Sequence, residues 1–287
     1  MVSAQYESEW RAWHAARLAE FNDPHGWLSL SGQIWLKEGK PAVIDGIPGS
    51  WQLKDGQVVY LPDSSEETVE IDGQPALSPT VIPLGYNEYS VEGSSVPVLY
   101  HDIELEVLER TNDQGERIVS IRVHDPRAAV RNHLNDFDTF PLDERWIVSA
   151  RFTSDPGGRS AYKTVERGVR ESFDELGTLT LTINGTEYPL HVWGYDTPEG
   201  VSAYIHFTDA TSGRTTYGAG RYVRRPLASL HADGTLDLNR LVFFPCAVTN
   251  YVTCPLPPAD NHIPIEITAG EKLPPHEIIE RKSTYAG

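Results

Sequence analysis

Between residues 42 and 123 the chain consists of short segments in which apolar and polar side chains alternate. Successive side chains of a β-strand point to opposite faces of a sheet, so this alternation predicts strands with one buried and one solvated face. Asp45-Gly46, Asp55-Gly56 and Asp72-Gly73 stand between some of the segments, and such dipeptides join antiparallel neighbours. We therefore expect an antiparallel β-sandwich over residues 23–125.

The second half of the chain carries a similar pattern, which predicts a second β-rich sandwich or barrel over residues 126–272. The strand-like segments are Trp146–Phe152, Ala161–Glu166, Thr178–Ile183, Glu187–Trp193, Val201–Phe207, Arg221–Val223, Thr235–Leu238 and Ile263–Ile267. Asn184-Gly185 predicts a hairpin, because both residues tolerate the positive φ of a type I′ turn. Asp209 with Thr211 predicts an Asx-turn between two later strands. Residues 273–287 are expected to form a C-terminal tail.

A helix is expected within residues 1–22, ahead of the sandwich. Ser3 is a suitable N-cap, and Asn22-Asp23-Pro24 should end the helix. Four large apolar side chains fall near one face at helical spacing, namely Trp10, Trp13, Leu18 and Phe21. Such a stripe predicts a face that docks on the body of the protein. The whole chain is thus expected to be mainly β with an N-terminal helix.

The charge of the chain excludes some classes of partner. With 41 acidic and 24 basic residues the formal net charge is −17, whereas nucleic-acid binding needs clustered Lys and Arg. The charge also disfavours an anionic membrane surface. No apolar run approaches the ~18 residues of a membrane-spanning helix, and the first residues lack the apolar core of a signal peptide. We expect a cytoplasmic protein, in which a structural disulfide would be uncommon.

Arg221 is the most prominent candidate for a functional charge, because it lies among apolar and small residues. A buried guanidinium needs a partner, so it either forms a structural ion pair or binds a ligand. We expect Asp237 to be that partner, with residues 224–234 connecting two adjacent antiparallel strands. In a strand, Asp237 and Asn239 would share one face and Arg240 would lie on the other. The pattern therefore predicts that these four side chains share one neighbourhood.

The stretch Thr235–Lys272 holds both cysteines, Cys246 and Cys254. Their spacing fits neither the Cys-x-x-Cys of zinc and redox sites nor a haem-attachment motif. His262 is a candidate base or third metal ligand, but the sequence alone does not bring it to a cysteine. The ordinary interpretation is a pair of small buried hydrophobic side chains. We predict no metal site, and no cofactor is identified.

Several motifs of this region resemble a known family. They are Tyr217–Tyr222 (YGAGRY), Asp237–Arg240 (DLNR), Phe243–Ala247 (FFPCA), Cys254–Pro258 (CPLPP) with Asn261, and Ala269–Glu271 (AGE). They are similar to the signature of the bacterial and archaeal family called domain of unknown function 1684, and the similarity extends back to Gly26-Trp27-Leu28. The family pattern has Asn-Pro where this chain has Phe243-Phe244, so a polar group near Cys246 is missing. The resemblance implies a fold but no activity. Gly218 and Gly220 lack the third glycine of a dinucleotide-binding loop and are expected to let the chain pass close to a neighbour.

The leading hypothesis is a protein that binds a small anionic metabolite in a pocket of the C-terminal β region. The predicted ligand-binding residues are Arg221, Asp237, Asn239, Arg240, Asn261 and Glu271. One alternative is a hydrolase or redox enzyme that uses Cys246 or Cys254. Another is a structural or interaction protein without a pocket. Whether the protein is an enzyme, and its oligomeric state, are left open by the sequence.

Overall fold

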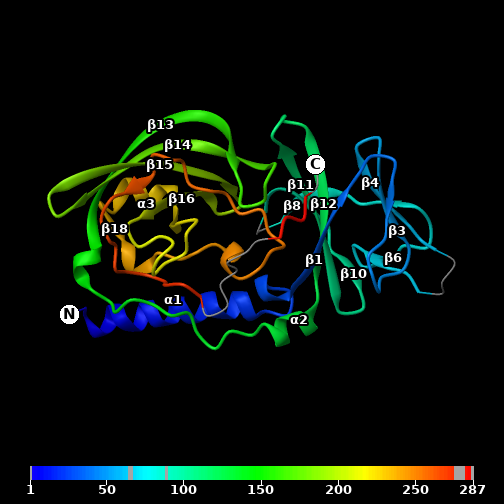
Figure 1. The fold of residues 1–287 in the computed structure, drawn as a ribbon, viewed down its shortest axis with the longest axis horizontal. Coiled ribbons are helices and arrows are strands. Elements are labelled where there is room, and N and C mark those ends of the chain that lie inside the picture. The colour runs from blue at the N-terminus through cyan, green and yellow to red at the C-terminus, as the bar shows by residue number, and fades with distance from the viewer. Residues whose placement is uncertain (1, 64–66, 88–89, 275–281, 286–287) are drawn as a thin grey trace.

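The computed structural model describes residues 2–63, 67–87, 90–274 and 282–285 (Figure 1). It confirms a mainly β protein that begins with a helix and is built from antiparallel sheets. In Figure 1 a curled sheet and a smaller strand-rich body lie side by side, and the N-terminal helix runs beneath the curled sheet. No helix in the described ranges is long and apolar enough to cross a membrane.

The N-terminal helix α1 spans Ala4–Asn22, as predicted. The Ser3 hydroxyl caps it by accepting a hydrogen bond from the Tyr6 amide at 3.2 Å. The docking face is also confirmed, since Trp10 and Phe21 are buried. Arg17 lies between them and is buried as well, so the docking face carries a charge that the apolar stripe did not predict.

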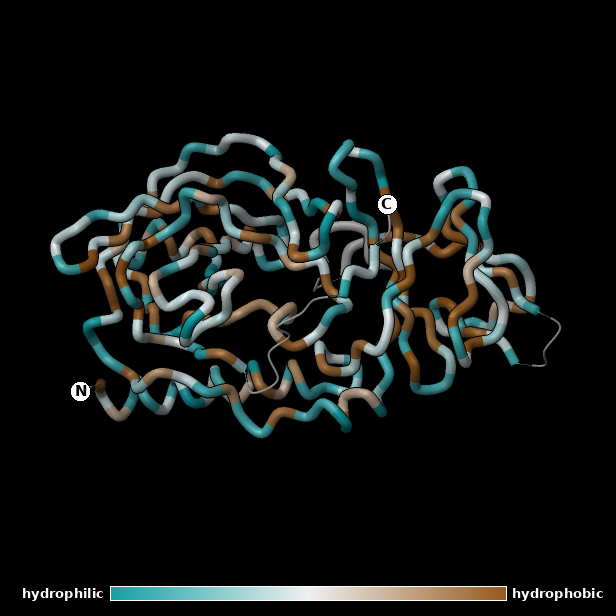
Figure 2. The backbone as a smooth tube through the Cα atoms, viewed as in Figure 1, coloured by the Kyte–Doolittle hydropathy of each residue, from teal (hydrophilic) through white to brown (hydrophobic). Residues whose placement is uncertain are grey.

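The N-terminal body is the predicted sandwich. Its strands are β1 Leu30–Leu36, β2 Pro41–Ala42, β3 Ser50–Lys54, β4 Gln57–Leu61, β5 Glu70–Ile71, β6 Gln74–Pro75, β7 Thr80–Val81, β8 Leu84–Asn87, β9 Ser90–Ser95, β10 Val98–Tyr100, β11 Ile103–Asn112 and β12 Arg117–His124. Strands β2, β3, β4 and β7 form one sheet, and β1, β12 and β11 belong to another. The apolar residues of both sheets form one core, and Figure 2 shows apolar stretches inside this body and hydrophilic ones at its outer turns.

The C-terminal body is a long antiparallel meander that curls over its own core (Figure 1). Its elements are α2 Pro126–Arg131, β13 Ile147–Lys163, β14 Val169–Ile183, β15 Thr186–Thr197, β16 Gly200–Asp209, β17 Arg221–Pro226, α3 Leu227–Ala232, β18 Thr235–Asp237 and β19 His262–Ile263. Short 3₁₀ helices are η1 Trp27–Ser29, η2 Glu144–Trp146, η3 Leu238–Arg240 and η4 Pro245–Ala247. The predicted hairpin is confirmed, since Asn184 and Gly185 have φ of 51° and 79° between β14 and β15.

The two bodies are joined by strand pairing as well as by the chain. Strand β11 pairs with β14 through Thr111↔Arg170 and Asn112↔Val169. One sheet path therefore runs from β17 through β14 and β11 to β6. The division of the chain at residue 125 stays a prediction. Residues on one face of β11 and β12 and residues of strands β15 to β17 line a common cavity.

Two sequence predictions about residues 224–240 are wrong. Strand β18 ends at Asp237, which caps the 3₁₀ helix η3 by accepting a hydrogen bond from the Asn239 amide at 3.0 Å. The expected strand alternation through Arg240 therefore does not occur, because the side-chain cap competes with the strand ladder. Strand β18 pairs with β13, and β17 pairs with β16, so residues 224–234 contain α3 and do not connect two neighbouring strands.

Candidate functional site

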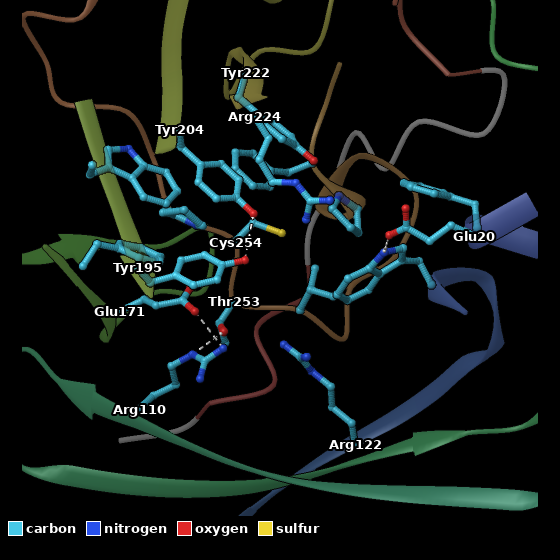
Figure 3. Close-up of a pocket in the computed structure, with 18 of the residues that line it drawn as sticks. Glu20, Arg110, Arg122, Glu171, Tyr195, Tyr204, Tyr222, Arg224, Thr253 and Cys254 are labelled. Carbon is cyan, nitrogen blue, oxygen red and sulfur yellow. Dashed lines mark hydrogen bonds and ion pairs between the residues drawn. The ribbon is translucent and has the colours of Figure 1, made fainter. Parts of the chain in front are cut away.

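A cavity of about 120 Å³ lies between α1, the sheet face of β11 and β12, and strands β15 to β17 (Figure 3). The loop that follows η4 closes it with Thr253, Cys254 and Pro255. Its charged lining residues are Arg17, Arg110, Arg122 and Arg224 on one hand and Glu20, Glu106 and Glu171 on the other. The cavity thus concentrates arginines in a chain whose net charge is −17.

Two of these arginines come from neighbouring strands of the sandwich. Arg110 on β11 and Arg122 on β12 lie on the face opposite the sandwich core, because side chains alternate along a strand and Val107 and Ile121 occupy the other face. Arg110 is held by the Glu171 carboxylate at 2.9 Å and by the Thr253 hydroxyl at 2.9 Å. Its guanidinium is therefore anchored by protein groups.

Arg122 is held more weakly than Arg110. It is 4% exposed, and its Nη1 lies 3.3 Å from Glu106 Oε2. The same Glu106 oxygen lies 3.6 Å from His124 Nε2, so this carboxylate is shared. Arg122 Nε has no hydrogen-bond partner among the described residues. Burial lowers the pKa of Arg122, and Figure 3 shows its guanidinium directed into the cavity.

The opposite wall is aromatic and is built by cross-strand neighbours. Trp193 on β15 pairs with Tyr204 on β16, and their rings stack at 4.5 Å. Tyr222 on β17 continues the wall and stacks on Phe244 at 4.0 Å. The hydroxyls of Tyr195 and Tyr204 lie 3.1 Å apart. Burial raises the pKa of Tyr204 well above 10, so its hydroxyl stays protonated and remains able to donate a hydrogen bond.

Helix α1 is fixed above the cavity by a buried ion pair. Arg17 Nε lies 2.6 Å from Glu271 Oε1, and Arg17 Nη2 lies 3.0 Å from Glu271 Oε2. Arg17 also donates to the Phe243 carbonyl at 2.7 Å, and Glu271 accepts from the Phe243 amide at 3.0 Å. One turn along, Glu20 accepts a hydrogen bond from Trp27 Nε1 at 3.0 Å. The predicted ligand-binding residue Glu271 thus joins α1 to the stretch Thr235–Lys272.

Arg221 does not pair with Asp237 as predicted. Its Nη2 forms an ion pair with Asp209 at 2.9 Å, and both side chains are 1% exposed. The same Nη2 donates to the Ile267 carbonyl at 2.9 Å. The predicted Asx-turn is confirmed, since the Thr211 amide donates to Asp209 at 2.8 Å. The tertiary fold places Asp209, and not Asp237, against Arg221. Because this pair is fully buried, the arrangement favours the interpretation of Arg221 as part of a structural ion pair.

The other residues expected beside Arg221 form a separate network. Asp237 accepts hydrogen bonds from Tyr6 at 2.8 Å and from Arg240 at 3.3 Å. Asn239 donates to the Asp143 carbonyl at 3.1 Å. Asp237 and Arg240 line a groove of about 600 Å³ beside α1. The predicted neighbourhood is therefore divided between two networks.

Asn261 and His262 lie along β15 and β16. Asn261 is fully buried, and its side-chain amide donates to the carbonyls of His191 and His206 at 2.9 Å each. His262 is exposed, and its Nδ1 lies 2.9 Å from the Thr208 hydroxyl. A ligand-binding role for the six residues named from the sequence stays a prediction.

Both cysteines are buried thiols. Cys254 lines the cavity, while Cys246 packs in an apolar cluster that includes Phe21 and Phe243. Burial raises the pKa of the Cys254 thiol well above 9, and the adjacent Cys246 thiol raises it further. Such a thiol is protonated at neutral pH and is a poor nucleophile. Within the described residues no group of three or more His, Cys, Asp or Glu side chains is placed to hold a metal ion.

Sequence reasoning missed the cavity arginines. Arg110 and Arg122 belong to segments whose alternation was correctly interpreted as strand, so their polar face was expected to meet solvent. The available signal was the polar face itself, since Ser120, Arg122 and His124 occupy alternate positions of β12. What covers that face is decided by residues far away in the chain.

These observations define a mainly β protein with a cavity between buried arginines and an aromatic wall. Residues 132–272 match the model of a family described as Protein of unknown function (DUF1684), which confirms the resemblance of the sequence motifs. The chain is also similar to an uncharacterized protein from Haloarcula marismortui whose solution NMR structure is known. The two are 26% identical, the match covers 50% of this chain and 78% of that chain, and the TM-score is 0.41. No curated protein matches the chain.

Proposed function

We propose that this protein binds a small anionic metabolite in the cavity between the β11–β12 face and the aromatic wall. The observation that carries the proposal is Arg122, whose guanidinium is 4% exposed, faces the cavity and keeps an Nε without a partner in the described part of the chain. A buried charge with unsatisfied donors is costly. A carboxylate in the cavity would satisfy those donors with charge-assisted hydrogen bonds.

The size of the cavity limits the ligand. Its volume is about 120 Å³, and an apolar cavity of ~150 Å³ is known to hold benzene. By this comparison the cavity itself holds a ligand, or the part of one, of at most about six non-hydrogen atoms. A carboxylate metabolite of this size fits, whereas a nucleotide does not.

The alternatives have less support. A cysteine-dependent enzyme needs a thiolate, and burial raises the pKa of Cys254. The candidate base His262 is exposed and is hydrogen-bonded to the Thr208 hydroxyl. A purely structural protein would be expected to fill the space between its two bodies with side chains, and here a cavity lined by arginines remains.

The test is a titration of the protein with small carboxylates, followed by calorimetry. We expect wild type to bind at least one of them saturably, and Arg122→Met to weaken binding about 10- to 100-fold, because a hydrogen bond to a charged group contributes about 1.5–3 kcal/mol. Arg151→Met is the control, since Arg151 is 66% exposed on β13. Equal affinities of the two variants would refute the proposal.

A second measurement separates binding from folding. Arg122→Met removes an incompletely satisfied buried charge but also takes one partner from Glu106, which keeps His124 at 3.6 Å. Its free energy of unfolding should therefore fall by less than the about 3–5 kcal/mol expected when a buried pair is broken outright. A loss of several kcal/mol would assign Arg122 to the structural framework. Mass spectrometry of the purified protein under native conditions would show whether an anion copurifies.

A further inference from the structure

We propose that the ligand is a dianion, a dicarboxylate of four or five carbons whose two carboxylates are held by Arg122 and Arg224 on opposite walls of the cavity. This inference rests on the proposed function and adds the class of anion. It is carried by the placement of Arg224, which comes from the C-terminal body, while Arg122 comes from the sandwich. Figure 3 shows the two side chains directed into the cavity from opposite sides.

Arg224 is positioned by strand pairing. It lies directly across from Tyr204 in the β16–β17 ladder, and Tyr204 lies across from Trp193 in the β15–β16 ladder. Cross-strand neighbours on one face have side chains in contact, so the aromatic row ends in a guanidinium at the cavity. Arg224 contacts the Tyr204 hydroxyl, and it forms no ion pair with a carboxylate of the described ranges within 4.0 Å.

The other lining arginines are already neutralised by close carboxylates. Arg17 is paired with Glu271 at 2.6 Å, and Arg110 with Glu171 at 2.9 Å. By contrast, Arg122 shares a carboxylate with a histidine at 3.3 Å. Arg122 and Arg224 are therefore the two lining cations with the least neutralisation. One monoanion would satisfy only one of them.

The surface between the two arginines suits the middle of a dicarboxylate. Cys254 and Phe244 also line the cavity and offer apolar contact to methylene groups. The Tyr195 and Tyr204 hydroxyls are hydrogen-bonded to each other, and the one that accepts keeps its proton to donate to a ligand. Succinate and glutarate have roughly eight or nine non-hydrogen atoms, more than the cavity alone would hold by comparison with benzene. The carboxylate at Arg224 would therefore lie at the cavity edge, beside the groove of about 600 Å³ that Tyr222 and Arg224 also line. Glu20 lies at the edge and is bonded to Trp27.

The test compares chain length and charge at constant ionic strength. Wild type and the variants Arg122→Met, Arg224→Met and Arg225→Met are each titrated with butyrate, malonate, succinate, glutarate and adipate. Arg225 is the matched control because it follows Arg224 on the same strand, faces the other way and pairs with Asp233. We expect succinate or glutarate to bind at least 10-fold more tightly than butyrate. We expect Arg224→Met to remove this preference while butyrate affinity stays within about twofold, with Arg225→Met unchanged.

The outcomes distinguish this inference from the function beneath it. If butyrate binds as tightly as every dicarboxylate, or if Arg224→Met and Arg225→Met behave alike, the dianion inference is overturned and anion binding at Arg122 stands. If no carboxylate binds wild type, both are overturned. Arg224 is exposed at the cavity edge, so its replacement should leave the thermal unfolding temperature unchanged. An unchanged unfolding temperature would show that the variant is folded and that a lost preference for dicarboxylates is a change in binding.

Discussion

Acidification should destabilise this protein through one buried histidine. His206 on β16 is fully buried, and its ring lies against Phe244 with centroids 4.9 Å apart. Its Nε2 donates to the Ala219 carbonyl at 3.0 Å, so the ring is neutral with the proton on that nitrogen. Nδ1 has no hydrogen-bond partner in the residues that the structure describes. Burial lowers the pKa of His206 from 6.5 to about 3.

The sign of the effect follows from which state binds the proton. The unfolded chain protonates this histidine near pH 6.5, whereas the folded protein resists protonation until about pH 3. Stability from the neutral ring is therefore complete above pH 6.5 and is lost as the pH falls toward 3. At pH 5 the unfolded state gains about 2 kcal/mol from this proton.

Urea unfolding at pH 7.5 and pH 5.0 measures the effect. His206→Gln keeps a side-chain donor for the Ala219 carbonyl and removes the titration. We expect the free energy of unfolding of wild type to fall by about 2 kcal/mol more than that of the variant over this range. His191→Gln is the control, because His191 is 55% exposed and should follow wild type. An equal loss of stability in wild type and His206→Gln would refute the reasoning.

Two further predictions concern packing. Arg17→Met should cost about 3–5 kcal/mol in urea unfolding because it leaves a buried carboxylate unpaired, whereas Arg11→Met at an exposed pair should cost less than about 1 kcal/mol; similar losses would contradict the role given to the buried pair. Gly220→Ala should lower the unfolding temperature more than Gly46→Ala. Both glycines have positive φ, a conformation that costs an L-residue with a side chain about 1–2 kcal/mol. In addition, a Cβ at Gly220 would lie 2.5 Å from a backbone oxygen, while one at Gly46 meets no described atom within 4 Å. Equal shifts would show that the backbone relieves the contact.

Local chemistry was enough for the secondary structure of much of this chain. The N-terminal helix has its own cap at Ser3, and the Asn184-Gly185 hairpin needs only the positive φ that those two residues adopt easily. The Asx-turn at Asp209 joins atoms two residues apart. Gly220 was expected to allow a close approach, and it lies against the Phe207 carbonyl. The cap, the hairpin and the Asx-turn depend on near neighbours in the sequence, and at Gly220 the residue type alone allowed the approach.

Partner choice depended on the tertiary structure. Arg221 required a carboxylate, and several were compatible with the pattern, but the fold placed Asp209 against it and left Asp237 to cap a 3₁₀ helix. In the structure, Arg122 lies on the face of β12 away from the sandwich core. The alternation of side chains along a strand predicts which residues share a face of the sheet, but it does not predict which other part of the chain covers that face. The aromatic wall of β15 to β17 covers that face and turns a surface arginine into a cavity residue.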